Sequence, residues 1–243
     1  MQNPGRTPAR RITAVLFDMD NTLWDFVECK IAACDAVNGT LGIDRGRELL
    51  YYFLRGDGRS FEDPGHIRDF MTDNGVYSED LFADCCRVYE DVKAGNLAPF
   101  PNVERTLTRL KEKGLHLSIV TDAFMENAIA RLEQTGLAGM FDEVITADIT
   151  RCRKPDPKVF LYALGKMGRA PEEVLMVGDS LHRDIGPAKR LGMTTAYASY
   201  GDRNFLEDRT EEPDVVLKDI ADLLSVVEGN HRDIPVKRYQ NVP

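Results

Sequence analysis

Several acidic residues and one lysine stand at positions in the chain where side chains often do chemistry. Asp18 and Asp20 follow a short apolar run, and Asp179 and Asp184 belong to a segment that begins Gly-Asp-Ser. Lys154 lies in the segment Arg-Lys-Pro-Asp-Pro, just before an expected helix. Crowded carboxylates repel one another, and a hard divalent cation such as Mg²⁺ relieves that repulsion through oxygen ligands. The set suits phosphoryl transfer, in which one carboxylate can act as a covalent nucleophile.

The elements that must position these residues alternate between strand and helix. Short apolar runs predict strands at 12–17, 115–120, 143–147, 174–177, 194–198 and 215–216. Helical segments are expected between and after them at 103–113, 126–135, 158–167, 183–191 and 220–227. This alternation predicts an α/β fold: a Rossmann-like parallel sheet with helices on both faces. Ligands bind at the carboxyl ends of such strands, so we expect the carboxylates to gather at one edge of the sheet.

The segment after the first expected strand has a different character. Helical periodicity at 28–41 and 78–92, interrupted by Gly- and Asp-rich breaks, predicts a small all-helical domain. The expected domains are a discontinuous catalytic core at 1–24 and 99–230, a helical cap at 25–98 and a C-terminal tail at 231–243. The insert contains 15 acidic and 8 basic residues, a balance typical of a solvated helical surface.

The composition excludes several classes of protein. The 243 residues carry a formal net charge of −9, whereas nucleic-acid-binding proteins normally show a basic footprint. No apolar run approaches the roughly 20 residues that a membrane span requires. The five cysteines form no CxxC pair and the four histidines are scattered, so a zinc site has no support in spacing. Basic residues at the N-terminus precede no apolar signal segment, so we expect a cytoplasmic protein without nucleic-acid or membrane partners.

Four motifs resemble, in order, the four signatures of the haloacid dehalogenase (HAD) superfamily. They are Phe17-Asp18-Met19-Asp20-Asn21-Thr22-Leu23, Val120-Thr121, Arg153-Lys154-Pro155-Asp156-Pro157, and Gly178-Asp179-Ser180 with Asp184. The resemblance extends over residues 12–230, and the helical insert lies where this family carries its helical cap. It implies the phosphatase branch of the superfamily.

The resemblance implies a role for each acidic residue. Asp18 is the expected nucleophile, and Asp20 the general acid that protonates the leaving oxygen and then the base that activates water. The implied Mg²⁺ ligands are Asp18, the backbone carbonyl of Asp20, and Asp179. Asp184 is expected to support the metal's waters or Lys154, although it is also explained as ordinary first-turn helix charge.

Thr121, Asp122 and Lys154 are the expected substrate-binding residues. By the resemblance, Thr121 binds phosphoryl oxygens and Lys154 neutralises both the nucleophile and the phosphoryl group, although Thr121 also fits an ordinary helix N-cap. Asp122 and Ala123 depart from the family's commoner Asn and Gly. Because a carboxylate aimed at a phosphate would repel it, Asp122 is expected to cap the following helix or to pair with a cation such as Arg153 or an arginine of the cap. Capping is the favoured hypothesis.

The insert offers further polar residues near a Gly-rich break, namely Arg55, Asp57, Arg59 and His66. These side chains could reach a substrate, but exposed loop polarity is the simpler interpretation. Cys152 lies near the motif lysine in sequence and is interpreted as a spectator thiol.

Together these patterns predict a Mg²⁺-dependent phosphatase. It would hydrolyse a small phosphorylated metabolite, a phosphate monoester, through an aspartyl-phosphate intermediate, as a monomer or homodimer. The alternatives on the same core are a phosphomutase, a haloacid dehalogenase and a non-catalytic binding protein. A dehalogenase has no need of Asp20, because halide leaves unprotonated whereas an alkoxide does not. The presence of Asp18, Asp20, Lys154 and Asp179 together argues against a non-catalytic protein.

Overall fold

The computed structural model of the protein describes residues 12–56, 58–204 and 211–229. The C-terminal tail expected at 231–243 lies outside the described residues. The chain forms two compact units, Met1–Trp24 together with Pro99–Pro243, and Asp25–Ala98. Among the described helices, none combines the length and the apolar character that a membrane crossing requires.

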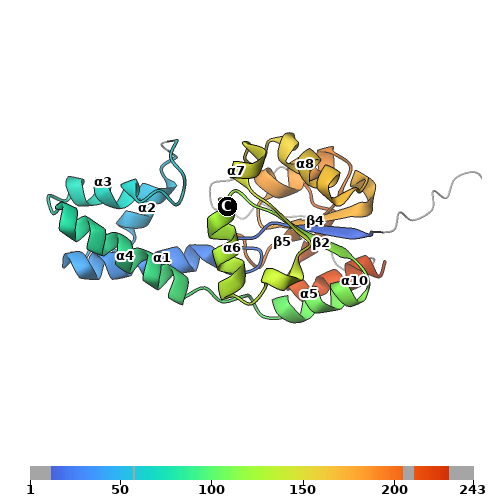
Figure 1. Ribbon diagram of the computed structural model, residues 1–243, viewed down its shortest axis with the longest axis horizontal. Helices are drawn as coiled ribbons and strands as arrows, with labels where there is room; N and C mark the ends of the chain where they lie inside the picture. The colour runs from blue at the N-terminus through green and yellow to red at the C-terminus, as the bar shows by residue number, and fades with distance from the viewer. Residues whose placement is uncertain (1–11, 57, 205–210, 230–243) are drawn as a thin grey trace, which may run out of the picture. The chain divides into compact units, whose positions relative to one another are not determined.

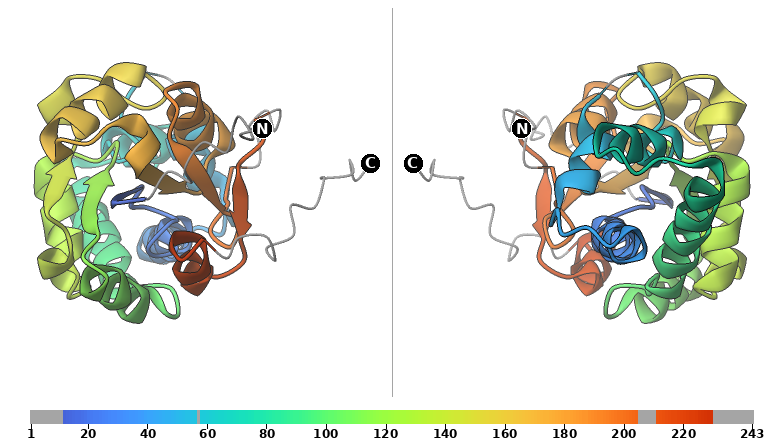
Figure 2. Two further views of the ribbon diagram at one scale, coloured as in Figure 1. Left: turned by 90° about the vertical axis from the view of Figure 1, so that its right-hand side faces the viewer. Right: turned by 90° about the vertical axis from the view of Figure 1, so that its left-hand side faces the viewer.

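The first unit is built on a parallel sheet of six strands in the order β3-β2-β1-β4-β5-β6, shown in Figure 2 with β1 near the middle. The strands are β1 (Ala14–Phe17), β2 (His116–Val120), β3 (Glu143–Ile145), β4 (Val174–Gly178), β5 (Thr194–Ala198) and β6 (Val215–Leu217). All four residues of β1 are fully buried, because the sheet is covered on both faces. β1 pairs with β2 on one side and β4 on the other, so the carboxyl ends of these three strands meet.

Helices cover both faces of this sheet, as the sequence predicts. They are α5 (Val103–Glu112), α6 (Met125–Gln134), α7 (Ala147–Thr150), α8 (Pro157–Met167), α9 (Gly186–Arg190) and α10 (Leu223–Val227), with short 3₁₀ turns η1 (Ala138–Met140), η2 (Pro171–Glu173) and η4 (Ile220–Asp222). Figure 1 shows α5 and α10 side by side on one face and α8 on the other. The third strand is shorter than expected, because Ala147 already begins α7.

The continuous helix expected at 183–191 is instead two segments. A π-helical turn, η3 (Leu181–Ile185), precedes α9. The Ser180 carbonyl accepts backbone N–H bonds from both Asp184 and Ile185, which widens this turn. Single π turns of this kind occur frequently at functional sites.

The second unit contains four helices: α1 (Phe26–Leu41), α2 (Glu48–Leu54), α3 (Gly65–Asp73) and α4 (Glu79–Gly95). Asp25 caps α1 by accepting the Glu28 N–H at 3.0 Å, and Ser78 caps α4 by accepting the Leu81 N–H at 3.3 Å. The two long helices agree with the expected segments, and the shorter α2 and α3 lie between the predicted breaks. The unit has its own apolar core, which includes Val37, Phe53 and Phe70.

Candidate active site

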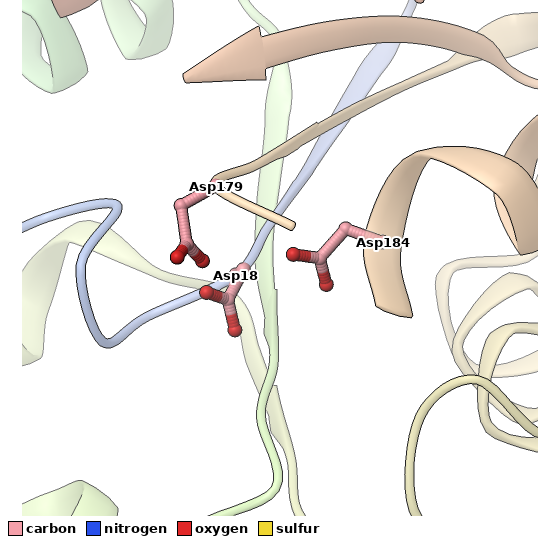
Figure 3. Close-up of side chains that lie close together, drawn as sticks. All are labelled: Asp18, Asp179 and Asp184. Carbon is pink, nitrogen blue, oxygen red and sulfur yellow. The ribbon is translucent and has the colours of Figure 1, made fainter. Parts of the chain in front are cut away.

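Three aspartates from separate parts of the chain converge at the carboxyl ends of β1 and β4. Asp18 follows β1, Asp179 follows β4, and Asp184 lies on η3. One carboxylate oxygen from each lies within 4.8 Å of the others, and all three residues are buried. Figure 3 shows their side chains lying close together. This acidic cluster, Asp18, Asp179 and Asp184, is the centre of the candidate site.

Local backbone features bring Asp184 into the cluster. Gly178 ends β4 where a Cβ atom would lie 2.5 Å from the Asp184 carboxylate, so only glycine fits there without displacement. The Asp184 Oδ2 atom accepts the Ser180 backbone N–H at 3.1 Å. The π turn and this hydrogen bond together direct the carboxylate back toward β4.

Lys154 supplies positive charge to the cluster. Its ammonium contacts the Asp18 carboxylate and lies 2.7 Å from Asp184 Oδ1. Burial disfavours the ammonium ion, yet Asp18 and Asp184 keep the pKa of Lys154 above its ordinary value. Burial likewise opposes ionisation of Asp18, yet Lys154 and Arg183 hold the pKa of that carboxyl below its ordinary value. Asp18 is thus the carboxyl of the cluster whose ionised form these cations favour.

The pKa values of the other two carboxyls are raised, mainly by burial. Burial, with the charge of Asp18 next, raises the pKa of Asp179 well above its ordinary value. Burial also raises the pKa of Asp184 to about 6, although Lys154 opposes the shift. The Oδ1 atom of Asp179 is buried and accepts no hydrogen bond from any described residue. An unsatisfied buried carboxylate oxygen in an acidic cluster is the kind of ligand that a hard divalent cation takes.

Thr121 and Asp122 follow β2 at the same edge of the sheet. Thr121 is buried, and its hydroxyl oxygen accepts the Ala123 N–H at 3.2 Å. Asp122 Oδ1 accepts the backbone N–H of Lys154 at 2.9 Å, and its Oδ2 lies 3.8 Å from Arg183 Nη1. Asp122 therefore ties together two loops of the site.

The hypothesis that Asp122 caps the next helix is wrong. Phe124 occupies the N-cap position of α6 and makes no side-chain cap. Asp148, from α7, instead accepts the Met125 N–H at 3.0 Å. The alternative hypothesis, that Asp122 pairs with a cation, named Arg153 or an arginine of the cap. The cation that pairs with Asp122 is instead Arg183. The guanidinium carbon of Arg153 lies 5.9 Å from the centre of the Phe124 ring.

Asp20 is the fifth acidic residue of the site, and its side chain is 22% exposed. Its carboxylate accepts hydrogen bonds from the Trp24 indole and from Arg131 of α6. The hydroxyl of Thr22, which lies between Asp20 and Trp24 in the sequence, donates to Asp18 Oδ2 at 3.2 Å. The loop after β1 thus holds both of its aspartates by side-chain bonds.

Sequence reasoning missed three residues of this site: Arg131, Arg183 and Asn204. Asn204 Nδ2 donates to Asp179 Oδ2 at 2.9 Å and to the Asp179 carbonyl at 3.1 Å, while its Oδ1 accepts from Arg183 Nη2 at 3.2 Å. Arg183 adjoins Asp184 in sequence, a signal that could have identified it. Asn204 and Arg131 lie outside every motif, so nothing local marks them.

Polar residues of the helical unit are engaged within that unit. The Asp69 carboxylate pairs with both Arg55 and Arg59. His66 is 1% exposed, its Nε2 lies 3.0 Å from the Ser60 carbonyl, and its ring packs 5.0 Å from the Phe53 ring. Exposed loop polarity is therefore wrong for His66, because α3 turns it into the unit's core.

Asp57 and Cys152 are the remaining residues that the sequence analysis singled out. Asp57 lies outside the described residues. Cys152 is half-buried against the core of the first unit and is a free thiol.

A parallel sheet with a buried acidic cluster and a lysine at its carboxyl edge suits the hydrolysis of phosphate esters. The sequence model described as haloacid dehalogenase-like hydrolase matches residues 12–192, and the chain belongs to this family.

Relatives and solved structures agree with this assignment. The chain is 31% identical over 230 residues to glyceraldehyde 3-phosphate phosphatase of Methanocaldococcus jannaschii, covering 91% of this chain and 100% of that one. It is 31% identical to phosphoglycolate phosphatase of Vibrio cholerae, covering 90% and 98% of the two chains. A solved HAD phosphatase from Thermococcus onnurineus is 29% identical and covers 90% of this chain and 99% of its own, with a TM-score of 0.63.

Proposed function

We propose that the protein is a Mg²⁺-dependent phosphatase that hydrolyses small phosphate monoesters through an aspartyl-phosphate intermediate. The observation that carries the proposal is the buried acidic cluster with Lys154 bonded to two of its members. The family and the names of the relatives support the same class of reaction. The reaction suits the site because phosphoryl transfer mainly requires positioning and neutralisation of charge.

The residues present fit a magnesium ion. The orphaned Oδ1 atom of Asp179 and an oxygen of Asp18 are the side-chain ligands we propose, and the resemblance adds the Asp20 carbonyl. The Asp184 carboxylate accepts from Lys154 and from the Ser180 N–H, so we assign it to supporting the lysine and the metal's waters. When bound, Mg²⁺ supplies positive charge that neutralises phosphoryl oxygens and the clustered carboxylates.

In the first step, a carboxylate oxygen of Asp18 attacks the phosphorus atom. The bond between phosphorus and the ester oxygen breaks, and Asp20 gives a proton to the departing alkoxide. Lys154 lowers the repulsion between the Asp18 carboxylate and the phosphoryl group. The Thr121 hydroxyl and neighbouring backbone N–H groups are the proposed contacts for the phosphoryl oxygens, and Asp122 keeps Lys154 in place through its backbone.

In the second step, a water molecule attacks the phosphorus atom of the aspartyl phosphate. Asp20 takes the proton from that water, the bond between phosphorus and Asp18 oxygen breaks, and inorganic phosphate leaves. Protonation of the departing alkoxide in the first step is the reason that ester hydrolysis needs Asp20, whereas displacement of a halide by Asp18 does not.

We propose small anionic monophosphates as the substrates. Glyceraldehyde 3-phosphate and phosphoglycolate, which the relatives' names give, are esters of three and two carbon atoms. The helical unit 25–98 is the proposed cap domain. We also propose a cytoplasmic location, in keeping with such metabolites.

A panel of phosphate esters, assayed for released inorganic phosphate with Mg²⁺ or with a chelator, tests this function. Phosphoglycolate, glyceraldehyde 3-phosphate and p-nitrophenyl phosphate should be hydrolysed only with the metal. Asp18→Asn should lose at least about a thousandfold in kcat, because an amide is a poor nucleophile. Asp80→Asn, an exposed position on α4, is the matched control. Metal-independent turnover, or an active Asp18→Asn variant, would refute the proposed mechanism.

A further inference from the structure

The carboxylate of Asp20 is held from two sides by residues that the sequence motifs do not contain. Trp24 Nε1 donates to Asp20 Oδ1 at 2.9 Å, and Arg131 Nη1 donates to Asp20 Oδ2 at 2.7 Å. Because the two bonds reach different oxygens, they specify the rotation of the carboxylate plane as well as its position. We call Trp24, Asp20 and Arg131 the acid–base clamp.

Both donors of the clamp are fixed by their surroundings. Trp24 is fully buried, and its backbone forms bridges with Asp20 on one side and Pro99 on the other. The Arg131 side chain is only 7% exposed, although it projects from α6. A buried guanidinium requires an anionic or polar partner, so the bond to Asp20 satisfies Arg131 while it orients the acid.

The clamp joins parts of the chain that are remote in sequence. Asp20 follows β1 and Arg131 lies on the helix after β2, and these two strands pair in parallel. A side chain on the helix after β2 can therefore reach the loop after β1. The structure does not need this contact to complete the sheet, since β1 and β2 are already joined by their backbone ladder.

We propose that Arg131 and Trp24 are positioning residues for the acid–base work of Asp20. This inference rests on the proposed function, in which Asp20 protonates the leaving oxygen and later takes a proton from water. Each carboxylate oxygen has two lone-pair sites, so an oxygen that accepts from the clamp can also carry the transferred proton. The indole and the guanidinium together hold the carboxylate in one orientation through both proton transfers.

An ion pair that merely ties α6 to the loop after β1 would make different predictions. Its loss would lower thermal stability but would leave the ratio of turnover on poor and good leaving groups unaltered. That ratio separates a positioning role from a structural one, whereas the environment of the Trp24 indole tests whether the clamp exists.

The first measurement is the indole Nε1–H resonance in a ¹H–¹⁵N spectrum of the metal-free protein. Trp24 is the chain's one tryptophan, so the spectrum contains a single indole resonance. Arg131→Gln and Asp20→Asn should each move this resonance by several linewidths, whereas Arg109→Gln, on exposed α5, should leave it in place. A resonance unmoved by Arg131→Gln, in a folded variant, overturns the clamp whether or not the protein hydrolyses esters.

The second measurement is steady-state hydrolysis of an alkyl and an aryl phosphate. Arg131→Gln should lower kcat for the alkyl ester by about tenfold to a hundredfold with KM changed less than about twofold, since general acid–base catalysis contributes about a hundredfold or more. The aryl ester should lose less, and Arg131→Lys should recover part of the loss.

The decisive comparison adds Arg131→Gln to Asp20→Asn. In that background the arginine substitution should cause no further loss of kcat, because its effect acts through the carboxylate. A full additional loss, or equal losses on both esters, overturns the positioning role. A wild-type protein that hydrolyses none of the esters would instead refute the proposed function, while the indole resonance still reports on the clamp.

Discussion

Two of the buried lysines, Lys154 in the sheet unit and Lys30 in the helical unit, have opposite surroundings. In the sheet unit, Lys154 is 5% exposed and its ammonium contacts the carboxylates of Asp18 and Asp184. In the helical unit, Lys30 is 0% exposed and its ammonium donates to the Phe61 carbonyl at 2.6 Å. That ammonium also lies 3.9 Å from the centre of the Phe61 ring and 4.2 Å from that of Phe53.

The difference shows that burial of a charge does not by itself mark a catalytic group. The faces of Phe53 and Phe61 and the Phe61 carbonyl, none of which titrates, contact the Lys30 ammonium. Lys154 instead sits among carboxyls whose pKa values are displaced in both directions. Proton transfer and metal binding need titratable partners, so the chemistry is expected at Lys154 and the packing role at Lys30.

Among the substitutions that test this comparison of lysines, Lys154→Met should have the largest effect. The change leaves the buried carboxylates without their ammonium, and we expect kcat/KM for phosphate esters to fall by about a hundredfold or more. Lys158→Met, at an exposed position on α8, should change it little. Phosphate release assays on both variants test this expectation. An active Lys154→Met protein would show that Lys154, like Lys30, is not needed for the reaction.

A smaller effect is expected at Asn204, which orients Asp179 so that Oδ1 remains available. Asn204→Ala should weaken Mg²⁺ or Mn²⁺ binding by about tenfold to a hundredfold, as loss of a ligand's hydrogen-bond partner does. Calorimetric titration of the protein without substrate measures this affinity. Asn102→Ala, which removes a bond to Asp219 elsewhere in the sheet unit, is the control. Unchanged affinity in Asn204→Ala would show that Asp179 needs no such support.

The pH dependence of metal binding should follow the raised pKa of Asp184, about 6. A raised pKa means that Asp184 binds its proton more tightly in the folded protein than in the unfolded chain. The contribution of this proton to the free energy of unfolding is therefore lost as pH rises toward about 6. Mg²⁺ competes with those protons, so its increase of Tm should be larger at about pH 7.5 than at about pH 5. An equal increase of Tm at both pH values would contradict the buried acidic site.

Asp122→Asn should have a modest effect. The amide oxygen still accepts the Lys154 N–H, and only the attraction to Arg183 is lost, so kcat/KM should change by less than about tenfold. Asp122→Ala also removes the bond to the lysine backbone and should cost about 1 kcal/mol of unfolding free energy. Kinetics and denaturant unfolding of the pair test this. A loss near a hundredfold in Asp122→Asn would assign the carboxylate a direct part in the reaction.

The smallest effect on activity is expected from Lys30→Met. Replacing a buried charge by an apolar side chain of similar length is often neutral or stabilising, so Tm should stay level or rise. The kcat for phosphate esters should remain within about twofold of wild type, because general stability effects away from a site leave turnover intact. A folded variant with a tenfold lower kcat would show that Lys30, packed against Phe53 and Phe61, contributes to the reaction.

The sequence by itself determined the order of the strands along the chain and the residues at their carboxyl ends. An apolar run of strand length followed by Asp18 or Asp179 is a local pattern, and parallel strands place such residues at one edge. The extents of α1 and α4 also follow from local periodicity and capping. Each family motif is a short segment of neighbouring residues, so it can be recognised from the sequence. The resemblance then implies roles for the acidic residues in these motifs.

Only the tertiary structure decided how these residues are held. The partners Arg131 and Asp20 are 111 residues apart, Lys154 and Asp122 are 32 apart, and Asn204 and Asp179 are 25 apart. No periodicity links such pairs, since each depends on which strands are neighbours and on the path of the loops that follow them. Asp122 illustrates the point. Local preference favours a helix cap at this position, but the backbone N–H of Lys154 lies beside the carboxylate and donates to it instead.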